Sequence, residues 1–156
     1  MTTKNQELAA WVSDVATLTQ ADNIVWCDGS EQEYQQIVNL MLDDGSLSSL
    51  NSDTHPNCYL HLSDPQDVAR VEHLTFICSD DQATVGDNNN WMPVADAKQK
   101  MNELYMGCMQ GRTMYVIPYC MGPVDSPYSR CGVEITDSPY VVINMKLMTR
   151  MGTKAL

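Results

Sequence analysis

The sequence predicts an α/β fold, in which helices flank a β-sheet. Two observations lead to this prediction. Helical and strand-like hydrophobic patterns alternate along the chain, and the hydrophobic and charged fractions, 44% and 19%, are ordinary for a globular protein. The length of 156 residues is that of one domain. A folded chain of this size buries about 70% of its unfolded surface, so we expect a sizeable core.

The first elements are a helix, a strand and a second helix. Residues 6–18 place apolar side chains on one face at helical spacing, and residues 23–27 form a short apolar run typical of a strand. Ser30 and Glu33 then form a capping-box pattern, in which each side chain can satisfy an exposed amide at the start of a helix. This second helix is expected to stop near Gly45.

The middle of the chain predicts shorter elements. Residues 58–62 and 75–78 have the composition of strands. Between them, a Ser-Asp-Pro start followed by apolar and charged residues predicts a short helix over residues 63–71. Residues 80–90 are polar and contain glycine, so we expect a surface loop there.

The last third predicts two helices and two strands. Residues 93–109 have a helical pattern, whereas residues 113–119 and 131–136 are apolar or alternating and predict strands. Ser138 precedes a proline and is expected to cap a final helix that runs toward Gly152. The methionines and leucine of this last segment are expected to pack in the core rather than to form a partner surface.

The net charge limits the partners that this chain can bind. Its formal value is −11, from 20 acidic and 9 basic residues. Such a surface repels nucleic-acid phosphates and anionic lipid headgroups, so we expect no nucleic acid and no membrane as partner. Residues 1–10 carry no secretory pattern, and no apolar stretch approaches the roughly 20 residues that span a bilayer. Six cysteines without a C-x-x-C pair favour reduced thiols in a cytoplasmic protein over a disulfide framework.

Motifs for nucleotide, metal or nucleophilic chemistry are absent from the sequence. It contains neither a G-x-x-x-x-G-K-[ST] loop nor a G-x-G-x-x-G. His55, His61 and His73 lack the spacing of a metal site, and the cysteines are expected to be small buried residues. By its pattern alone, Arg70 would be a surface side chain paired with Asp67 at i,i+3.

Several short segments nevertheless form an ordered signature along nearly the whole chain. They are VWCDGS at residues 25–30, SDPQDVARVE at 63–72, TFIC at 75–78, NNW at 89–91, GCM at 107–109, GRTMYV at 111–116, MGP at 121–123, SP at 126–127, TDSPY at 136–140 and MTRMG at 148–152. In this order they resemble the N-terminal domain of the GTP-dependent phosphoenolpyruvate carboxykinase family. The resemblance implies that the sheet is a mixed β-sheet with flanking helices.

The resemblance also implies a function. The family converts oxaloacetate and GTP to phosphoenolpyruvate, GDP and CO₂ in gluconeogenesis, with Mn²⁺ as metal and Mg²⁺ on the nucleotide. Arg70 matches the family arginine that binds the substrate carboxylate, a role that suits the bidentate guanidinium fork. Glu72 matches a family residue that contacts the closed lid of the active site. Residues 1–156 would then be the substrate-side domain of such an enzyme.

The resemblance places the family's P-loop, metal-binding lysine, histidine and aspartate, lid and guanine pocket downstream of residue 156. We therefore expect a fragment truncated before the nucleotide-binding domain, which binds neither metal nor GTP and has no carboxykinase activity by itself. Two alternatives stay open: a stand-alone module that binds a carboxylate through Arg70 without chemistry, and a structural or partner-binding domain. An apolar face uncovered by truncation is expected to self-associate.

Overall fold

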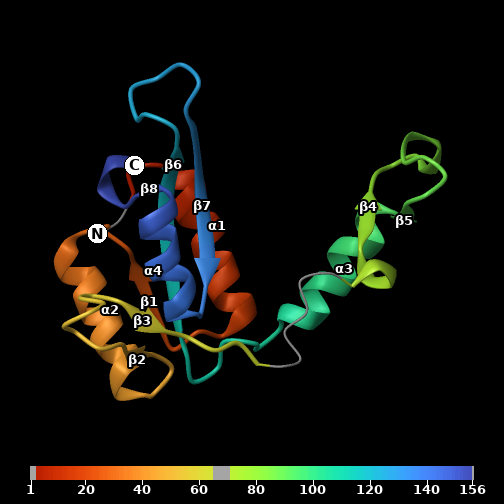
Figure 1. Cartoon of the computed structure of the whole chain (residues 1–156). Helices are drawn as coiled ribbons and strands as arrows, with labels where there is room; N and C mark the ends of the chain where they lie inside the picture. The colour runs from red at the N-terminus through yellow and green to blue at the C-terminus, as the bar shows by residue number, and fades with distance from the viewer. Residues whose placement is uncertain (1–2, 65–70, 156) are drawn as a thin grey trace.

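The computed structural model describes residues 3–64 and 71–155. It consists of an α/β body and an arm, residues 71–105, that projects from the body and carries β4, β5 and α3 (Figure 1). The helix predicted over residues 63–71 falls largely outside the described residues. Val71 itself has an extended backbone, with φ −129° and ψ 92°.

The body is built on a four-stranded mixed sheet, as the sequence and the family resemblance predict. The central strand β6 (Thr113–Met121) runs parallel to β1 (Asn23–Trp26). It runs antiparallel to β7 (Arg130–Thr136) and to the short β8 (Arg150–Met151). The strands predicted at 23–27, 113–119 and 131–136 are thus confirmed.

Both faces of this sheet are covered by helices. The helix α1 (Gln6–Thr19) covers one face, and α2 (Glu31–Asp43) and α4 (Pro139–Met148) cover the other (Figure 1). Side chains alternate along β6: Met114 and Val116 pack in the cluster below α1, and Ile117 packs in the cluster of α2 and α4. A strand that is buried on both faces has a continuous apolar sequence, and this pattern made β6 predictable.

Pro118 lies in the middle of β6, where a missing N–H would normally break a ladder. The strands β1 and β8 share one edge of β6 but occupy different ends of it. On the β1 side, Cys27 N donates to Val116 O at 2.9 Å. On the β8 side, Gly152 N donates to Pro118 O at 2.7 Å. The missing donor of Pro118 therefore falls at the junction between the two edge strands, just beyond the last register pair of β1 with β6.

Two smaller sheets complete the fold. In the body, β2 (Ser48–Ser49) pairs antiparallel with β3 (Tyr59–Leu60), which is shorter than the predicted strand over 58–62. In the arm, β4 (Phe76–Cys78) pairs in parallel with β5 (Asn90–Met92). The first of these arm strands was predicted; the second starts at the end of the segment expected to be loop.

The last element of the arm is a helix that is shorter than predicted. The helix α3 (Val94–Tyr105) ends before Met109, because Gly107, in the left-handed conformation at φ 68°, turns the chain. Gly107 N then donates to Leu18 O and Met109 N to Thr19 O, both at 2.9 Å. These two bonds fasten the base of the arm to the end of α1.

Some predictions about side chains are wrong. Ser138 precedes α4, but its side chain makes no capping hydrogen bond, and Pro139 at the first turn starts the helix instead. The exposed fractions of Leu147 and Met148 are 71% and 66%, whereas Met151 is buried as expected. Of the cysteines, only Cys27 and Cys120 are buried; the exposed ones are Cys58, Cys78, Cys108 and Cys131.

Among the helices of the described segments, none combines the length and apolar character required to cross a membrane.

Candidate functional site

Of the two predicted site residues, the structure describes only one. Arg70 lies outside the described residues. Glu72 begins a short 3₁₀ turn, Glu72–Leu74, in the arm, and its side chain is exposed. Within the described part of the chain its carboxylate accepts no hydrogen bond, so both oxygens can accept from an incoming N–H or O–H group.

The backbone around Glu72 is held by an asparagine from the neighbouring strand. Asn90 Nδ2 donates to Glu72 O at 2.9 Å and to Thr75 O at 3.1 Å. Side chains of the same two segments surround an open polar hollow of about 900 Å³, lined by Glu72, His73, Thr75, Asn88, Asn89 and Asn90. The arrangement presents an exposed carboxylate on a fixed backbone at the rim of an open hollow.

A second polar cluster lies in the body, where two loops cross at the β1–β8 junction. Asp28 and Gly29 follow β1, and Gly152 follows β8. Thr153 N donates to Asp28 O at 3.2 Å. A Cβ on Gly29 would lie 2.2 Å from Met151 O, and one on Gly152 would lie 1.9 Å from Asp28 O. Only glycine permits the two backbones to approach this closely.

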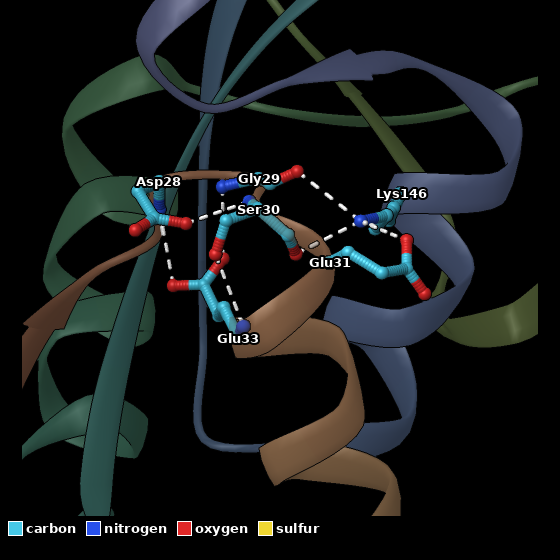
Figure 2. A network of polar contacts seen from close by, with 6 residues as sticks. All are labelled: Asp28, Gly29, Ser30, Glu31, Glu33 and Lys146. Atoms are coloured by element: carbon cyan, nitrogen blue, oxygen red, sulfur yellow. Dashed lines mark hydrogen bonds and ion pairs between the residues drawn. The ribbon is translucent and has the colours of Figure 1, made fainter.

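The capping box predicted for α2 is partly confirmed (Figure 2). Ser30 Oγ accepts from Glu33 N at 3.0 Å, as expected. The Glu33 carboxylate, however, accepts from Asp28 N at 3.0 Å and from Gly29 N at 2.9 Å. The Ser30 amide donates to Asp28 Oδ1 instead, and this bonding lowers the pKa of the Asp28 carboxyl. The carboxylates therefore organise the loop that precedes the helix.

Lys146 of α4 braces the same loop from the other side (Figure 2). Its Nζ donates to Gly29 O at 3.2 Å, to Ser30 O at 2.8 Å and to Glu31 Oε2 at 3.0 Å. An ammonium group has three N–H donors, and these three acceptors use them all. Lys146 is therefore a structural link between α2 and α4 rather than a free cation for a ligand.

We expect Lys146→Met to lower the free energy of unfolding by about 1.5–3 kcal/mol, because two carbonyls and a carboxylate lose a charged donor while the apolar stem is kept. Urea denaturation followed by circular dichroism measures the change. Lys154→Met is the matched control, since Lys154 is exposed and its loss is expected to stay within about 0.5 kcal/mol. Equal losses in the two variants would contradict the bracing role.

The histidine and cysteine residues considered as candidates for metal binding or nucleophilic chemistry include His61 and Cys27. In the described ranges, no three His, Cys, Asp or Glu side chains are grouped to hold a metal ion. The His61 ring stacks on Tyr140 with centroids 4.0 Å apart, and its Nδ1 lies 2.8 Å from Ser46 O. Burial, with the nearby charge of Glu33, raises the pKa of Cys27 to about 12, so this thiol is protonated at neutral pH and is a poor nucleophile.

Comparison with known proteins identifies the family. Residues 10–156 match the model of the phosphoenolpyruvate carboxykinase N-terminal domain. The chain belongs to this family. It is 50% identical over 153 residues to phosphoenolpyruvate carboxykinase [GTP] of Chlamydia pneumoniae and 46% identical over 154 residues to that of Corynebacterium jeikeium. These matches cover 98% and 99% of the chain.

The chain spans about a quarter of the length of these carboxykinases: the matched regions are 26% and 25% of the two relatives. What the chain shares with them is therefore their phosphoenolpyruvate carboxykinase N-terminal domain. The sequence patterns did not single out Lys146, Gly29 or Gly152, whose roles depend on contacts between distant segments. The local signals were Asp-Gly at the end of β1, which indicates a simple turn, and Gly152, which was expected only to mark the end of the last helix.

Proposed function

We propose that this chain is the N-terminal, substrate-side part of a cytoplasmic GTP-dependent phosphoenolpyruvate carboxykinase, which forms phosphoenolpyruvate, GDP and CO₂ from oxaloacetate and GTP in gluconeogenesis. The observation that carries the proposal is the family match over residues 10–156, together with about 50% identity to proteins named phosphoenolpyruvate carboxykinase [GTP]. In this proposal, the nucleotide-binding domain follows residue 156.

Arg70 binds the carboxylate of oxaloacetate in this proposal. A guanidinium fork can hold a carboxylate by two parallel hydrogen bonds and so fix the orientation of the reacting part of the substrate. Glu72 contacts the lid that closes over the site. The exposure of its carboxylate and the fixed backbone beneath it support this role, since the side chain is free to accept a hydrogen bond.

The chain's own residues do not fit the metal or the nucleotide that the family uses. The sequence has no P-loop, and residues 3–64 and 71–155 hold no cluster of metal-ligating side chains. We therefore assign Mn²⁺, Mg²⁺ and GTP to the remainder of the enzyme and derive no step through them. In this proposal, the role of the chain is to bind and orient the substrate.

A chimeric enzyme tests the proposal. This chain would replace the matching part of the Chlamydia pneumoniae carboxykinase, to which it is 50% identical over 153 residues. We expect the chimera to form phosphoenolpyruvate from oxaloacetate in a manner that depends on Mn²⁺ and GTP, and the isolated chain to show no turnover above background. A coupled assay for phosphoenolpyruvate measures both.

Two results would contradict the proposal. One is a chimera that melts cooperatively and binds GTP but makes no phosphoenolpyruvate, because its substrate side would then be incompetent. The other is turnover by the isolated chain, which would mean that the groups needed for phosphoryl transfer are present in residues 1–156.

A further inference from the structure

Two cysteines face each other across the hairpin of β6 and β7. Cys120 and Cys131 are register partners in this antiparallel pair, one step from its last pair, Met121 and Arg130. Directly opposed residues of an antiparallel pair project from the same face, with Cα atoms about 4.5–5.5 Å apart. This separation lies within the range of about 4.4–6.8 Å that a disulfide spans.

The two side chains also lie near each other, on the same face of the strand pair. The pKa of Cys131 is raised, chiefly by hydrogen bonding with the Cys120 side chain. The Cys120 sulfur is fully buried and lies 3.7 Å from Met121 O and 3.9 Å from Gly122 O, whereas Cys131 is exposed. One thiol of the pair is therefore open to a reagent from solution, and the other is shielded but close to it.

We propose that Cys120 and Cys131 are an oxidation site, at which a hydroperoxide converts the thiol pair to an intramolecular disulfide that links β6 to β7. The exposed Cys131 thiolate attacks one peroxide oxygen, the O–O bond breaks, and the departing oxygen leaves as water or an alcohol after taking a proton. Cys131 is then a sulfenic acid. The Cys120 sulfur attacks the Cys131 sulfur, the S–O bond breaks, and hydroxide leaves with the Cys120 proton as water.

The balance of this reaction is complete. Two thiols lose two electrons and two protons, and one hydroperoxide accepts them to give one water and one alcohol, or two waters from hydrogen peroxide. The other exposed cysteines, Cys58, Cys78 and Cys108, have no cysteine as a register partner. Because its pKa is raised, the Cys131 thiol is mostly protonated at neutral pH, and we expect no unusually fast reaction with peroxide. What separates Cys131 from the other exposed cysteines is that its oxidation yields an internal disulfide.

The position of the two cysteines in the hairpin allows a disulfide after a small movement of the strands. Cβ atoms of opposed residues lie about 4.5–5.5 Å apart, slightly wider than the usual 3.5–4.5 Å across a disulfide, so the strands must close together a little. The ladder ends one residue pair later, and residues 122–129 form an extended connection beyond it (Figure 1). A link that requires such closure is expected to be easily reduced by a dithiol.

The experiment uses the 156-residue chain and hydrogen peroxide as oxidant. A background variant replaces the other exposed cysteines (Cys58→Ser, Cys78→Ser and Cys108→Ser), so that three cysteines remain. After oxidation and denaturation, we expect two of these three to no longer react with a thiol reagent. Trypsin cuts after Arg112, Arg130 and Lys146, so peptides 113–130 and 131–146 should be joined in a mass spectrum. Dithiothreitol should separate them.

Cys131→Ser in the same background is the matched control and should keep both remaining thiols and give no joined peptides. The unsubstituted chain provides a second readout that does not depend on the folding of any variant, because the same two tryptic peptides should be joined in it. Sulfinic acid on Cys131 with Cys120 still free, or links between chains in place of the internal link, would overturn the proposal. So would unlinked peptides under conditions that oxidise Cys108.

Discussion

Replacing Gly152 with alanine should destabilise the domain by about 2–5 kcal/mol. At φ 89° an L-residue carries a left-handed penalty of about 1–2 kcal/mol, and overpacking adds about 1–3 kcal/mol. The added Cβ would lie 1.9 Å from Asp28 O and 2.5 Å from Gly29 N. Both atoms are backbone, so no rotamer change can relieve the overlap. Urea denaturation measures the loss as a lower midpoint at unchanged slope.

Gly45→Ala is the control that isolates the backbone penalty. Gly45 has φ 79°, and a Cβ there would meet no atom within 4 Å. This variant should therefore lose only the left-handed cost of about 1–2 kcal/mol. Gly29→Ala should resemble Gly152→Ala, because its Cβ would lie 2.2 Å from Met151 O. If all three variants lost the same amount, the crossing of the two loops would not be tight.

The elements that the sequence predicted are those whose signal is local. The helices α1 and α2 place apolar residues at helical spacing, and the run of β6 is apolar because both faces of the sheet are covered. Ser30 could also be recognised as a cap, since the bond from Glu33 N spans only three positions. In each case the residues that determine the structure lie within one or two turns of one another.

The features that escaped prediction depend on distant contacts or on very short segments. The bond from Lys146 to Gly29 O joins positions 117 residues apart, and no spacing rule reports such a pair. The strands β2 and β5 have two and three residues, too few to show an alternating pattern. Leu147 and Met148 follow the helical pattern of a core face, yet nothing in the described structure covers them.

The proposed site residues come from the family resemblance rather than from a physical pattern. By its local sequence Arg70 is an ordinary surface arginine with an acidic neighbour, and Glu72 is one of 20 acidic residues in the chain. No periodicity distinguishes a carboxylate that must stay free from one that solubilises a surface. The proposed assignment comes from the ordered segments of the family signature, because they indicate which arginine and which glutamate match the family's substrate-side residues.

We expect Arg70→Ala in the active chimera to lower kcat/KM for oxaloacetate by roughly 30- to 4,000-fold. Removing one partner of a bidentate charged pair costs about 2–5 kcal/mol, and each 1.4 kcal/mol is a factor of about ten in rate. The Kd for GTP should change by less than about threefold, because in the proposed role the guanidinium binds the carboxylate substrate and not the nucleotide. Initial rates at varied oxaloacetate and a separate GTP titration measure the two effects.

Two further variants separate a specific contact from general damage. Arg70→Lys keeps the charge but loses the planar fork, so it should recover only part of the loss at oxaloacetate. Arg130→Ala removes an exposed arginine at the end of the β6–β7 hairpin, whose Nη1 donates to the neighbouring Ser129 O, and it should change kcat/KM by less than about twofold. Equal losses for oxaloacetate and GTP in Arg70→Ala would argue against carboxylate binding, since a group that holds one substrate should not weaken both alike.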